Sequence, residues 1–527
     1  MTRHLLTAAL LAVALPTPAF GQAETWWGHV TALADDSMRG RQTGSPEHRK
    51  AAEYVASVFQ RAELQPAGTD GWFQPVRFRV RQINESRSSL ALVRGGKAEP
   101  LAFGADATIN LRGSAAGTVD APLVFIGYGL VSPEHGYDDL KGLGLKGKVA
   151  VVLAGAAPGG IPGPALAAAR AAAAEALDDA GALGVLTVAS PHADIPWDRY
   201  ALSRLHPQMR FATDSSPSSG HTAITVVLNH ARAERLFTGA PQHYAALQAL
   251  ADSGARLPRF DLPVRLRATV AVDESEAVSD NVVGLLRGAD PAVASEYIAL
   301  TAHLDHLGVG QPQGGDSIYN GAMDNASGIA TLLEAATSLG RRQAHPRRSL
   351  LFVAVTAEEK GLLGSDWFAE HPPLPAGSGI VANLNTDMFL PLNPLRQLLV
   401  NGLEESDLAD DVRRAAAKAG IEVITDPEPE RNAFVRSDQF SFIRRGIPAL
   451  SLKGGFAPGT PEHERILRWR QERYHGVEDE VTQPVDRQAA AAFNRLYPEV
   501  ILEVANRATR PSWYPTSAFR PEHTSSH

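Results

Sequence analysis

The chain has 527 residues, a formal net charge of −8, 20% charged residues and 44% hydrophobic residues. This length exceeds what one hydrophobic core supports and predicts two or three domains, and the acidic balance argues against a nucleic-acid binder, which usually has a basic excess. The chain has no cysteine, so disulfides and thiolate metal sites are excluded, and a metal would need His, Asp or Glu ligands.

Residues 1–21 have the features of a Sec-type signal peptide. Arg3 and His4 precede an apolar run, Leu5 to Leu15, and small residues flank Phe20 at a cleavage point before Gln22. The run is short for a membrane span, and an uncleaved anchor helix is the alternative. Because no later segment is long and apolar enough to cross a bilayer, we expect a periplasmic or secreted mature protein without a membrane span.

Residues 22–114 are expected to be the first part of a larger α/β domain. The stretch EYVASVFQRAEL places apolar side chains near one helical face, and FQPVRFRV and SSLALV alternate as strands do. Residues 115–257 have the pattern of an inserted module, because two β-rich runs, an alanine-rich helix and a further strand follow one another there.

Residues 258–509 are expected to form a central mixed, mostly parallel sheet flanked by helices. The apolar strands EYIALTAH, SLLFVAVTA and GIVANLNTD are separated by helical connections, an order typical of α/β domains. Residues 510–527 are rich in Pro, Ser, Thr and His, and we expect a poorly ordered tail there.

Candidate metal ligands follow these three strands. His303 ends the first, the adjacent pair Glu358 and Glu359 follows the second, and Asp387 follows the third. Because sites in open α/β sheets form outside the carboxyl ends of the strands, we expect these residues to converge. Two neighbouring carboxylates beside an apolar core need a cation or a shared proton, and imidazole together with carboxylates favours zinc.

Asp324, in the glycine-flanked loop NGAMDNASG, is a further ligand candidate. An aspartate that bridges two zinc ions would make a co-catalytic pair. One glutamate of the pair would then bind metal, while the other takes a proton from the metal-activated water. Asp305 lies two residues after His303, on the same side of extended backbone, so its carboxylate is expected to hold the far ring nitrogen of His303.

Five motifs, in chain order, carry a resemblance to a known family: HLDHLG, GAMDNASG, AEEKGLLGS, NTDM and RYHGVEDE. They resemble the dizinc aminopeptidases, the group that includes bacterial secreted leucine aminopeptidases and glutamate carboxypeptidase II. The inserted module resembles a β-rich protease-associated domain, and SMRGRQTGSPEHRKAAEYVASVF resembles the start of the family's peptidase domain. The resemblance covers nearly all of the mature chain and implies a zinc exopeptidase fold with two zinc ions.

The resemblance also implies roles for individual residues. The metal ligands would be His303, Asp324, Glu359, Asp387 and His475. Asp324 would bridge the ions and be followed by a non-proline cis peptide, and Glu358 would be the general base. His463 is the rival to His475, whereas His306 is expected to be a packing or pocket residue. Gln439 in SDQF departs from the Ser-Asp-His triplet common in relatives, so this segment is left out of the expected site.

The expected function is an exported exopeptidase, and above all an aminopeptidase that acts on peptides with a free N-terminus. The alternatives within the family are a glutaminyl cyclase and a carboxypeptidase, for which Arg431 and Arg436 are candidates to bind a terminal carboxylate. A non-catalytic, receptor-like binding protein on the same fold is the alternative of another class, and it would hold no zinc. The sequence has no signal for the oligomeric state or for the preferred substrate side chain.

Overall fold

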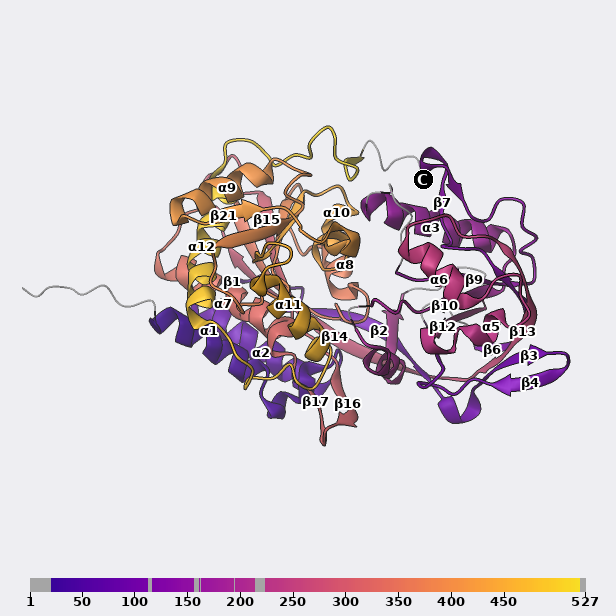
Figure 1. Ribbon diagram of the computed structural model, residues 1–527. Helices are drawn as coiled ribbons and strands as arrows, with labels where there is room; N and C mark the ends of the chain where they lie inside the picture. The colour runs from indigo at the N-terminus through magenta and orange to yellow at the C-terminus, as the bar shows by residue number, and fades with distance from the viewer. Residues whose placement is uncertain are drawn as a thin grey trace, which may run out of the picture.

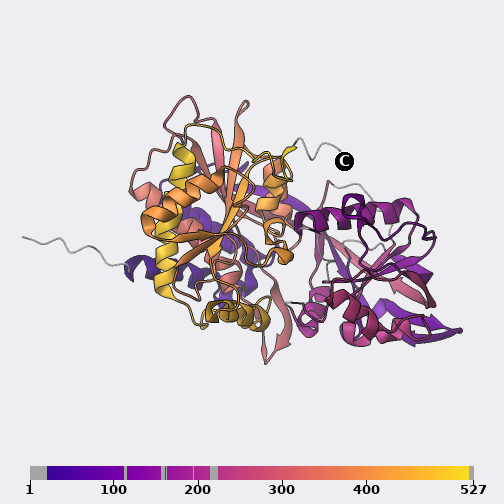
Figure 2. The same cartoon turned by 45° about the horizontal axis from the view of Figure 1, so that its top comes forward.

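The computed structural model describes residues 20–111, 116–155, 161, 163–193, 195–213 and 223–521. The chain forms two lobes, one from the indigo N-terminal and orange to yellow C-terminal segments, the other from the purple and magenta segment between them (Figures 1 and 2). Each lobe has its own large sheet. Residues 1–19, which include the apolar run of the expected signal peptide, lie outside the described residues.

The larger sheet has ten strands. In spatial order, nine of them are β11 (Gln208–Phe211), β2 (Phe73–Ile83), β14 (Val272–Leu286), β18 (Ser349–Val355), β15 (Glu296–His303), β19 (Gly379–Asn385), β22 (Ala449–Gly454), β20 (Gln397–Asn401) and β21 (Glu422–Ile424), and β1 (Gln65–Pro66) pairs with β14. Strands β18, β15, β19 and β22 are parallel neighbours, as are β20 and β21, and the other pairs are antiparallel. The expected mixed α/β sheet is confirmed, with its parallel part mainly in the centre.

Helices cover both faces of this sheet. One face is covered by α1 (Phe20–Leu33), α2 (Pro46–Arg61), α7 (Ser327–Arg341), α9 (Leu408–Ala419) and α12 (Arg487–Asn506), the other by α8 (Leu363–Glu370) and α10 (Gln439–Ile443). Along β18, Leu350 and Phe352 face the first layer while Leu351 and Val353 face the second. A strand buried on both faces needs an unbroken apolar sequence, which explains SLLFVAV.

The second sheet has eight strands. In spatial order they are β4 (Lys97–Pro100), β3 (Ser89–Arg94), β13 (Phe260–Val270), β6 (Gly117–Phe125), β9 (Val149–Leu153), β10 (Gly184–Val188), β12 (Ile224–Leu228) and β5 (Ala107–Ile109). The helices of this lobe include α3 (Gly163–Asp179), α5 (Glu234–Phe237) and α6 (Tyr244–Asp252). Two-stranded ribbons pair β7 (Val131–Ser132) with β8 (Tyr137–Asp138), and β16 (Gly308–Gln313) with β17 (Asp316–Tyr319).

The boundaries of the inserted unit differ from those expected. Strand β3 lies before residue 115 and β13 lies after residue 257, yet the two pair with each other in the second sheet. The unit therefore extends from about β3 to β13, and the expected limits of 115–257 are too narrow. Strands β2 and β14, paired over their length, connect the two lobes. Alternating segments look alike in sequence whichever sheet they join, so only the pairing reveals the boundary.

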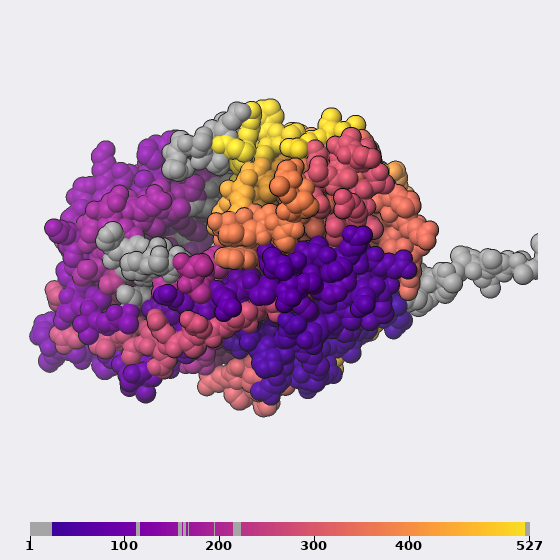
Figure 3. Space-filling model, turned by 180° about the vertical axis from the view of Figure 1, so that it is seen from behind, coloured from indigo at the N-terminus to yellow at the C-terminus, as the bar shows by residue number. Residues whose placement is uncertain are grey.

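The end of the chain is ordered further than expected. Up to Pro521 the segment after residue 510 packs on the larger lobe: Ser512 donates to Asp407, and the Trp513 ring nitrogen donates to the Gly446 carbonyl. The expectation of a poorly ordered tail is therefore wrong for these residues. In Figure 3 the indigo N-terminal and the orange and yellow C-terminal residues form one surface. No helix among the described residues has the length and apolar character of a membrane span.

Candidate metal centre

The candidate ligands lie at one edge of the larger sheet, beyond the carboxyl ends of three parallel strands. His303 ends β15, the pair Glu358–Glu359 follows β18, and Asp387 follows β19. Because these strands run in the same direction, their ends bring the side chains together. Asp324 reaches the same place from the loop before α7, and its peptide bond to Asn325 is cis, as the resemblance implies.

Two histidines face Asp324 from opposite sides. The Nε2 atom of His303 lies 3.2 Å from Asp324 Oδ1 and 3.4 Å from Asp387 Oδ1. The Nε2 atom of His475, in the loop after α11 (Pro461–Glu472), lies 3.2 Å from Asp324 Oδ2 and 3.4 Å from Glu359 Oε2. Each carboxylate oxygen of Asp324 thus belongs to a different group of side chains, which is the arrangement of a bridging ligand.

The donor atoms fit zinc. In a tetrahedral zinc site with bonds of about 2.0–2.1 Å, neighbouring ligand atoms lie roughly 3.3 Å apart, which matches the separations of 3.2 Å and 3.4 Å. Two groups have candidate ligand atoms within 4.8 Å of one another: His303, Glu358 and Asp387; and His306, Asp324 and Glu359. The Oδ1 atom of Asp387 is buried without a hydrogen bond from the described residues, as expected of an oxygen that accepts a cation.

The carboxylates of Asp324 and Glu358 have different electrostatic surroundings, which shift their pKa values in opposite directions. Burial alone would raise the pKa of Asp324, but the hydrogen bonds to His303 and His475 outweigh it and hold this pKa well below the usual value. Burial raises the pKa of Glu358 well above its usual value, opposed by His303 and reinforced by Asp438. The lowered pKa of Asp324 suits a metal ligand, which must be deprotonated, and the raised pKa of Glu358 suits a group that exchanges protons.

Asp305 has a different role from the one expected. The Nδ1 atom of His303 lies 3.1 Å from the backbone oxygen of Asp305, not from its carboxylate. The carboxylate instead accepts hydrogen bonds from the Thr43 hydroxyl at 2.8 Å and from the amides of Glu358 and Glu359 at 3.0 and 3.3 Å. The expectation for the side chain is wrong because the strand has already ended at His303, so that strict alternation no longer applies. The Asp305 carboxylate thus holds the backbone amides of Glu358 and Glu359 in place.

Two other histidines, His306 and His463, differ in how close they lie to the metal centre. His306 Nδ1 lies 2.8 Å from Glu359 Oε1, so this residue, expected to be a packing or pocket residue, borders the metal centre. His463 stacks on Phe456 at 4.8 Å between ring centroids, and its Nε2 atom lies 3.3 Å from Glu428. Since His475 lies 3.2 Å from Asp324 instead, the geometry favours His475 over His463 as a ligand. Gln439 is buried and accepts a hydrogen bond from Asn385, in keeping with a structural role.

Two residues that the sequence reasoning missed hold the loops around the centre. Asp479 is fully buried and its carboxylate accepts hydrogen bonds from the amides of Met323 and Asp324. Arg41 is also fully buried and donates to four backbone carbonyls, those of Leu33, Leu304, Asn320 and Gly321. Both residues stand inside quoted motifs, RYHGVEDE and SMRGRQTGS, but a sequence does not reveal which backbone groups a side chain will reach.

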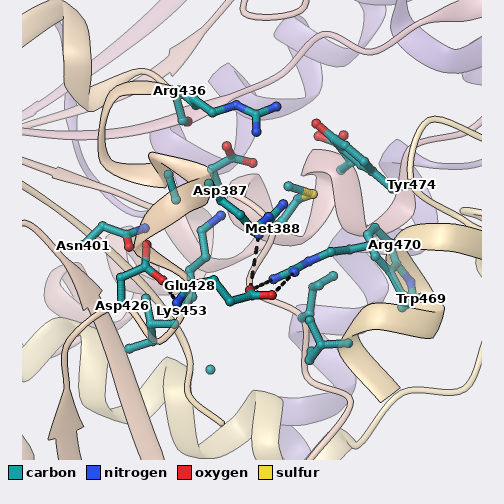
Figure 4. Close-up of a pocket in the computed structure, with 18 of the residues that line it drawn as sticks. Asp387, Met388, Asn401, Asp426, Glu428, Arg436, Lys453, Trp469, Arg470 and Tyr474 are labelled. Carbon is teal, nitrogen blue, oxygen red and sulfur yellow. Dashed lines mark hydrogen bonds and ion pairs between the residues drawn. The ribbon is translucent and has the colours of Figure 1, made fainter. Parts of the chain in front are cut away.

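A cavity of about 110 Å³ adjoins the metal centre (Figure 4). Its wall includes His303, Glu358 and Asp387 of the centre and, beyond them, Lys453, Arg431 and Arg436, with Phe456 and Trp469 among its apolar residues. The two arginines considered for a terminal carboxylate therefore border the same space as the candidate ligands. A substrate group bound here would lie beside the centre.

Residues 281–501 match the sequence pattern described as peptidase family M28. This part of the chain is a peptidase family M28 domain. It contains every residue of the candidate centre, from His303 to His475, and excludes the second sheet and the N-terminal helices. The M28 domain thus supplies all the candidate ligands by itself.

Similar proteins include leupeptin-inactivating enzyme 1 of Streptomyces exfoliatus, 30% identical over 37% of this chain and 40% of that protein. Aminopeptidase YwaD of Bacillus subtilis is 25% identical over 44% of this chain and 46% of that protein. The chain therefore spans less than half the length of these relatives.

Solved structures match more of the chain. An aminopeptidase from Aneurinibacillus sp. strain AM-1 has a TM-score of 0.56 at 19% identity, covering 93% of this chain and 95% of that one. BSAP, a zinc aminopeptidase from Bacillus subtilis, has a TM-score of 0.51 at 20% identity, covering 92% and 95%. At these identities the likeness establishes the fold alone, and the matches extend over both lobes of the chain.

Proposed function

We propose that the chain is an exported aminopeptidase that binds two zinc ions and removes N-terminal residues from peptides. The observation that carries this proposal is the position of Asp324, whose two oxygens each lie 3.2 Å from a different histidine, His303 and His475. The names of similar proteins, among them aminopeptidases and a zinc aminopeptidase, support the same conclusion. Export rests on the signal-peptide pattern of residues 1–21.

In this proposal His303 and Asp387 would hold one ion, Glu359 and His475 would hold the other, and Asp324 would be shared by both. When bound, the zinc pair supplies Lewis acidity to the attacking water and the scissile carbonyl and a site for the free α-amine. Glu358 takes a proton from the water at its carboxylate as the water oxygen adds to the carbonyl carbon. It then returns the proton to the leaving nitrogen as the C–N bond breaks, so one glutamate acts as base and then as acid.

The second lobe keeps its proposed relation to protease-associated domains, with the wider boundaries given above. It contacts the loop that carries His475: Arg199, in α4 (Trp197–Tyr200), donates to the backbone oxygens of Glu472 and Tyr474. We therefore assign the lobe a part in shaping the cleft as well as any binding role of its own.

The proposal is tested with one peptide sequence prepared in four forms, each end either free or blocked by acetylation or amidation. We expect cleavage of both forms with a free N-terminus, loss of activity with a chelator, recovery with zinc, and about two zinc ions per chain. Cleavage that requires a free C-terminus would identify a carboxypeptidase instead. Ammonia release from an N-terminal glutamine without peptide cleavage would identify a cyclase, and a chain that neither binds zinc nor turns over substrate would be a binding protein.

A further inference from the structure

The cavity beside the metal centre contains more positive than negative charge once the candidate metal site is set aside. The cationic residues of its wall are Arg431, Arg436, Lys453 and Arg470, and the acidic ones are Asp426 and Glu428. An excess of cations inside a half-enclosed space is costly unless an anion enters it. The charges of this wall therefore predict the chemistry of what binds there.

The two acids are already engaged by other groups. Arg470 binds Glu428 through two hydrogen bonds of 2.9 and 2.7 Å, and Arg431 lies 3.5 Å from the same carboxylate. Asp426 Oδ1 accepts the amide of Glu428 at 2.9 Å. Glu428 therefore has its charge balanced by arginines, and Asp426 holds a backbone amide. Among the described residues, no ion pair joins either acid to Lys453.

Two cations of the cavity wall, Lys453 and Arg436, have no hydrogen bond or ion pair with the described residues. Lys453 lies near the end of β22, and its ammonium forms no hydrogen bond or ion pair within the part of the chain that the structure describes. The same holds, over the same residues, for the guanidinium of Arg436, which is exposed at the cavity wall (Figure 4). Among the charges around Lys453, Asp387 gives the strongest favourable interaction. In the proposed enzyme Asp387 would bind metal, so Lys453 remains available to a ligand.

We propose that Lys453, assisted by Arg436, binds the side-chain carboxylate of an N-terminal Asp or Glu, so that acidic N-terminal residues are preferred. The inference rests on the proposed function, because that function places the α-amine at the metal centre and the first side chain in the adjoining cavity. The cavity volume of about 110 Å³ compares with about 10–15 Å³ needed by one water on the same scale, so size does not exclude larger side chains. Charge, and not volume, determines the selection.

The test compares peptides X-Ala-Ala-amide in which X is Glu, Gln, Leu or Lys. Amidation removes the terminal carboxylate, so the Glu side chain has the only carboxylate of the peptide. Gln is its neutral isostere, so the comparison of Glu with Gln measures the effect of that charge. We expect kcat/KM for Glu to exceed that for Gln by about tenfold or more, as for a charge-assisted hydrogen bond. In Lys453→Met this ratio should fall close to one, because the rate for Glu falls far more than the rates for Gln and Leu.

A matched control is Arg468→Met, since Arg468 is exposed on α11 and does not line the cavity; it should keep the wild-type ratio. Lys453→Met removes an unpaired charge, so we expect it to fold, and thermal unfolding checks this. Calorimetric binding of L-glutamate and L-glutamine to the zinc-loaded protein gives a readout without turnover, and glutamate should bind more tightly in the wild type only.

The outcomes separate the inference from the proposed function. Efficient cleavage of Leu peptides, with a Glu-to-Gln ratio near one in wild type and variant alike, would overturn the acidic preference and leave the aminopeptidase intact. If Lys453→Met instead impaired only Gln-Ala-Ala with a free C-terminus, the recognised carboxylate would be the terminal one and the assignment to the side chain would be wrong. If no peptide were cleaved, preferential glutamate binding that Lys453→Met abolishes would still support the site.

Discussion

The carboxylate of Asp479 accepts a hydrogen bond of 2.9 Å from the backbone amide of Asp324, the residue placed between the two histidines. The same carboxylate accepts a second bond of 2.9 Å from the amide of Met323. Because Asp479 lies four residues after His475, one short loop both supplies a candidate ligand and fixes the backbone of Asp324. This relationship couples the last sequence motif to the second.

Replacing Asp479 by Asn should weaken metal binding. Asparagine has one acceptor oxygen in place of two, so one of the two buried amides loses its partner and faces an NH₂ group. We expect zinc affinity to fall by about 10–100-fold, the usual effect of an outer-shell change, with about 1–3 kcal/mol of lost stability. Competition with a chromophoric chelator measures the affinity, and Glu480→Gln, one residue away, is the control. An unchanged zinc affinity in Asp479→Asn would show that Asp479 does not support the metal centre.

The sequence predicted the candidate ligands better than their supports. His303, Glu358 and Asp387 follow apolar strands whose parallel order can be inferred, so their convergence is a consequence of sheet topology. The supports depend on which carbonyl or amide a side chain reaches across loops. That is why Asp479 and Arg41 were missed and why Asp305 was given the wrong hydrogen-bond partner.

The predicted boundaries of the inserted unit were too narrow for a related reason. Strands β2 and β3 have similar alternating sequences, but β2 pairs with β14 in the larger sheet and β3 pairs with β13 in the smaller one. Alternation identifies a strand and its buried face, not its neighbour. The tail was misjudged because composition does not register single contacts such as that of Trp513 with Gly446.

Glu358→Gln should separate the metal site from the chemistry. If Glu358 is the base, the variant keeps its zinc and fold but loses about 10²–10⁴-fold in kcat. Glu359→Gln is the contrasting variant. Glu359 lies 3.4 Å from His475 and is a proposed ligand, so this variant should lose metal as well as activity. Zinc analysis and kcat measured on the same samples distinguish the two. Loss of zinc from Glu358→Gln would instead assign Glu358 as a ligand with His303 and Asp387.

Arg41→Met should destabilise the larger lobe. Arg41 is fully buried and its guanidinium serves four carbonyls of three separate segments, including that of Leu304 next to His303. Methionine fills similar space but leaves these acceptors unpaired, so we expect a loss of about 3–5 kcal/mol in the free energy of unfolding. Denaturant unfolding monitored by tryptophan fluorescence gives this value.

The control for that experiment is Arg39→Met. Arg39 is exposed and lies 3.7 Å from Glu47 in a surface ion pair, so its loss should cost at most about 1 kcal/mol. Equal effects of the two replacements would contradict the bridging role of Arg41.

Arg199→Met should test whether the second lobe helps to position His475. Arg199 donates to the backbone oxygens of Tyr474 at 3.0 Å and Glu472 at 2.8 Å, so the loop that bears the ligand is fixed from outside the M28 domain. Without these bonds the loop gains freedom, and a ligand displaced by a fraction of an ångström binds metal less well. We expect about a tenfold loss of zinc affinity that excess zinc restores, with kcat recovering in parallel and thermal stability nearly unchanged. Arg232→Met, in the same lobe but paired with Asp106, should alter neither. A fall in kcat that excess zinc does not rescue would mean that Arg199 acts on the cleft by another route than His475.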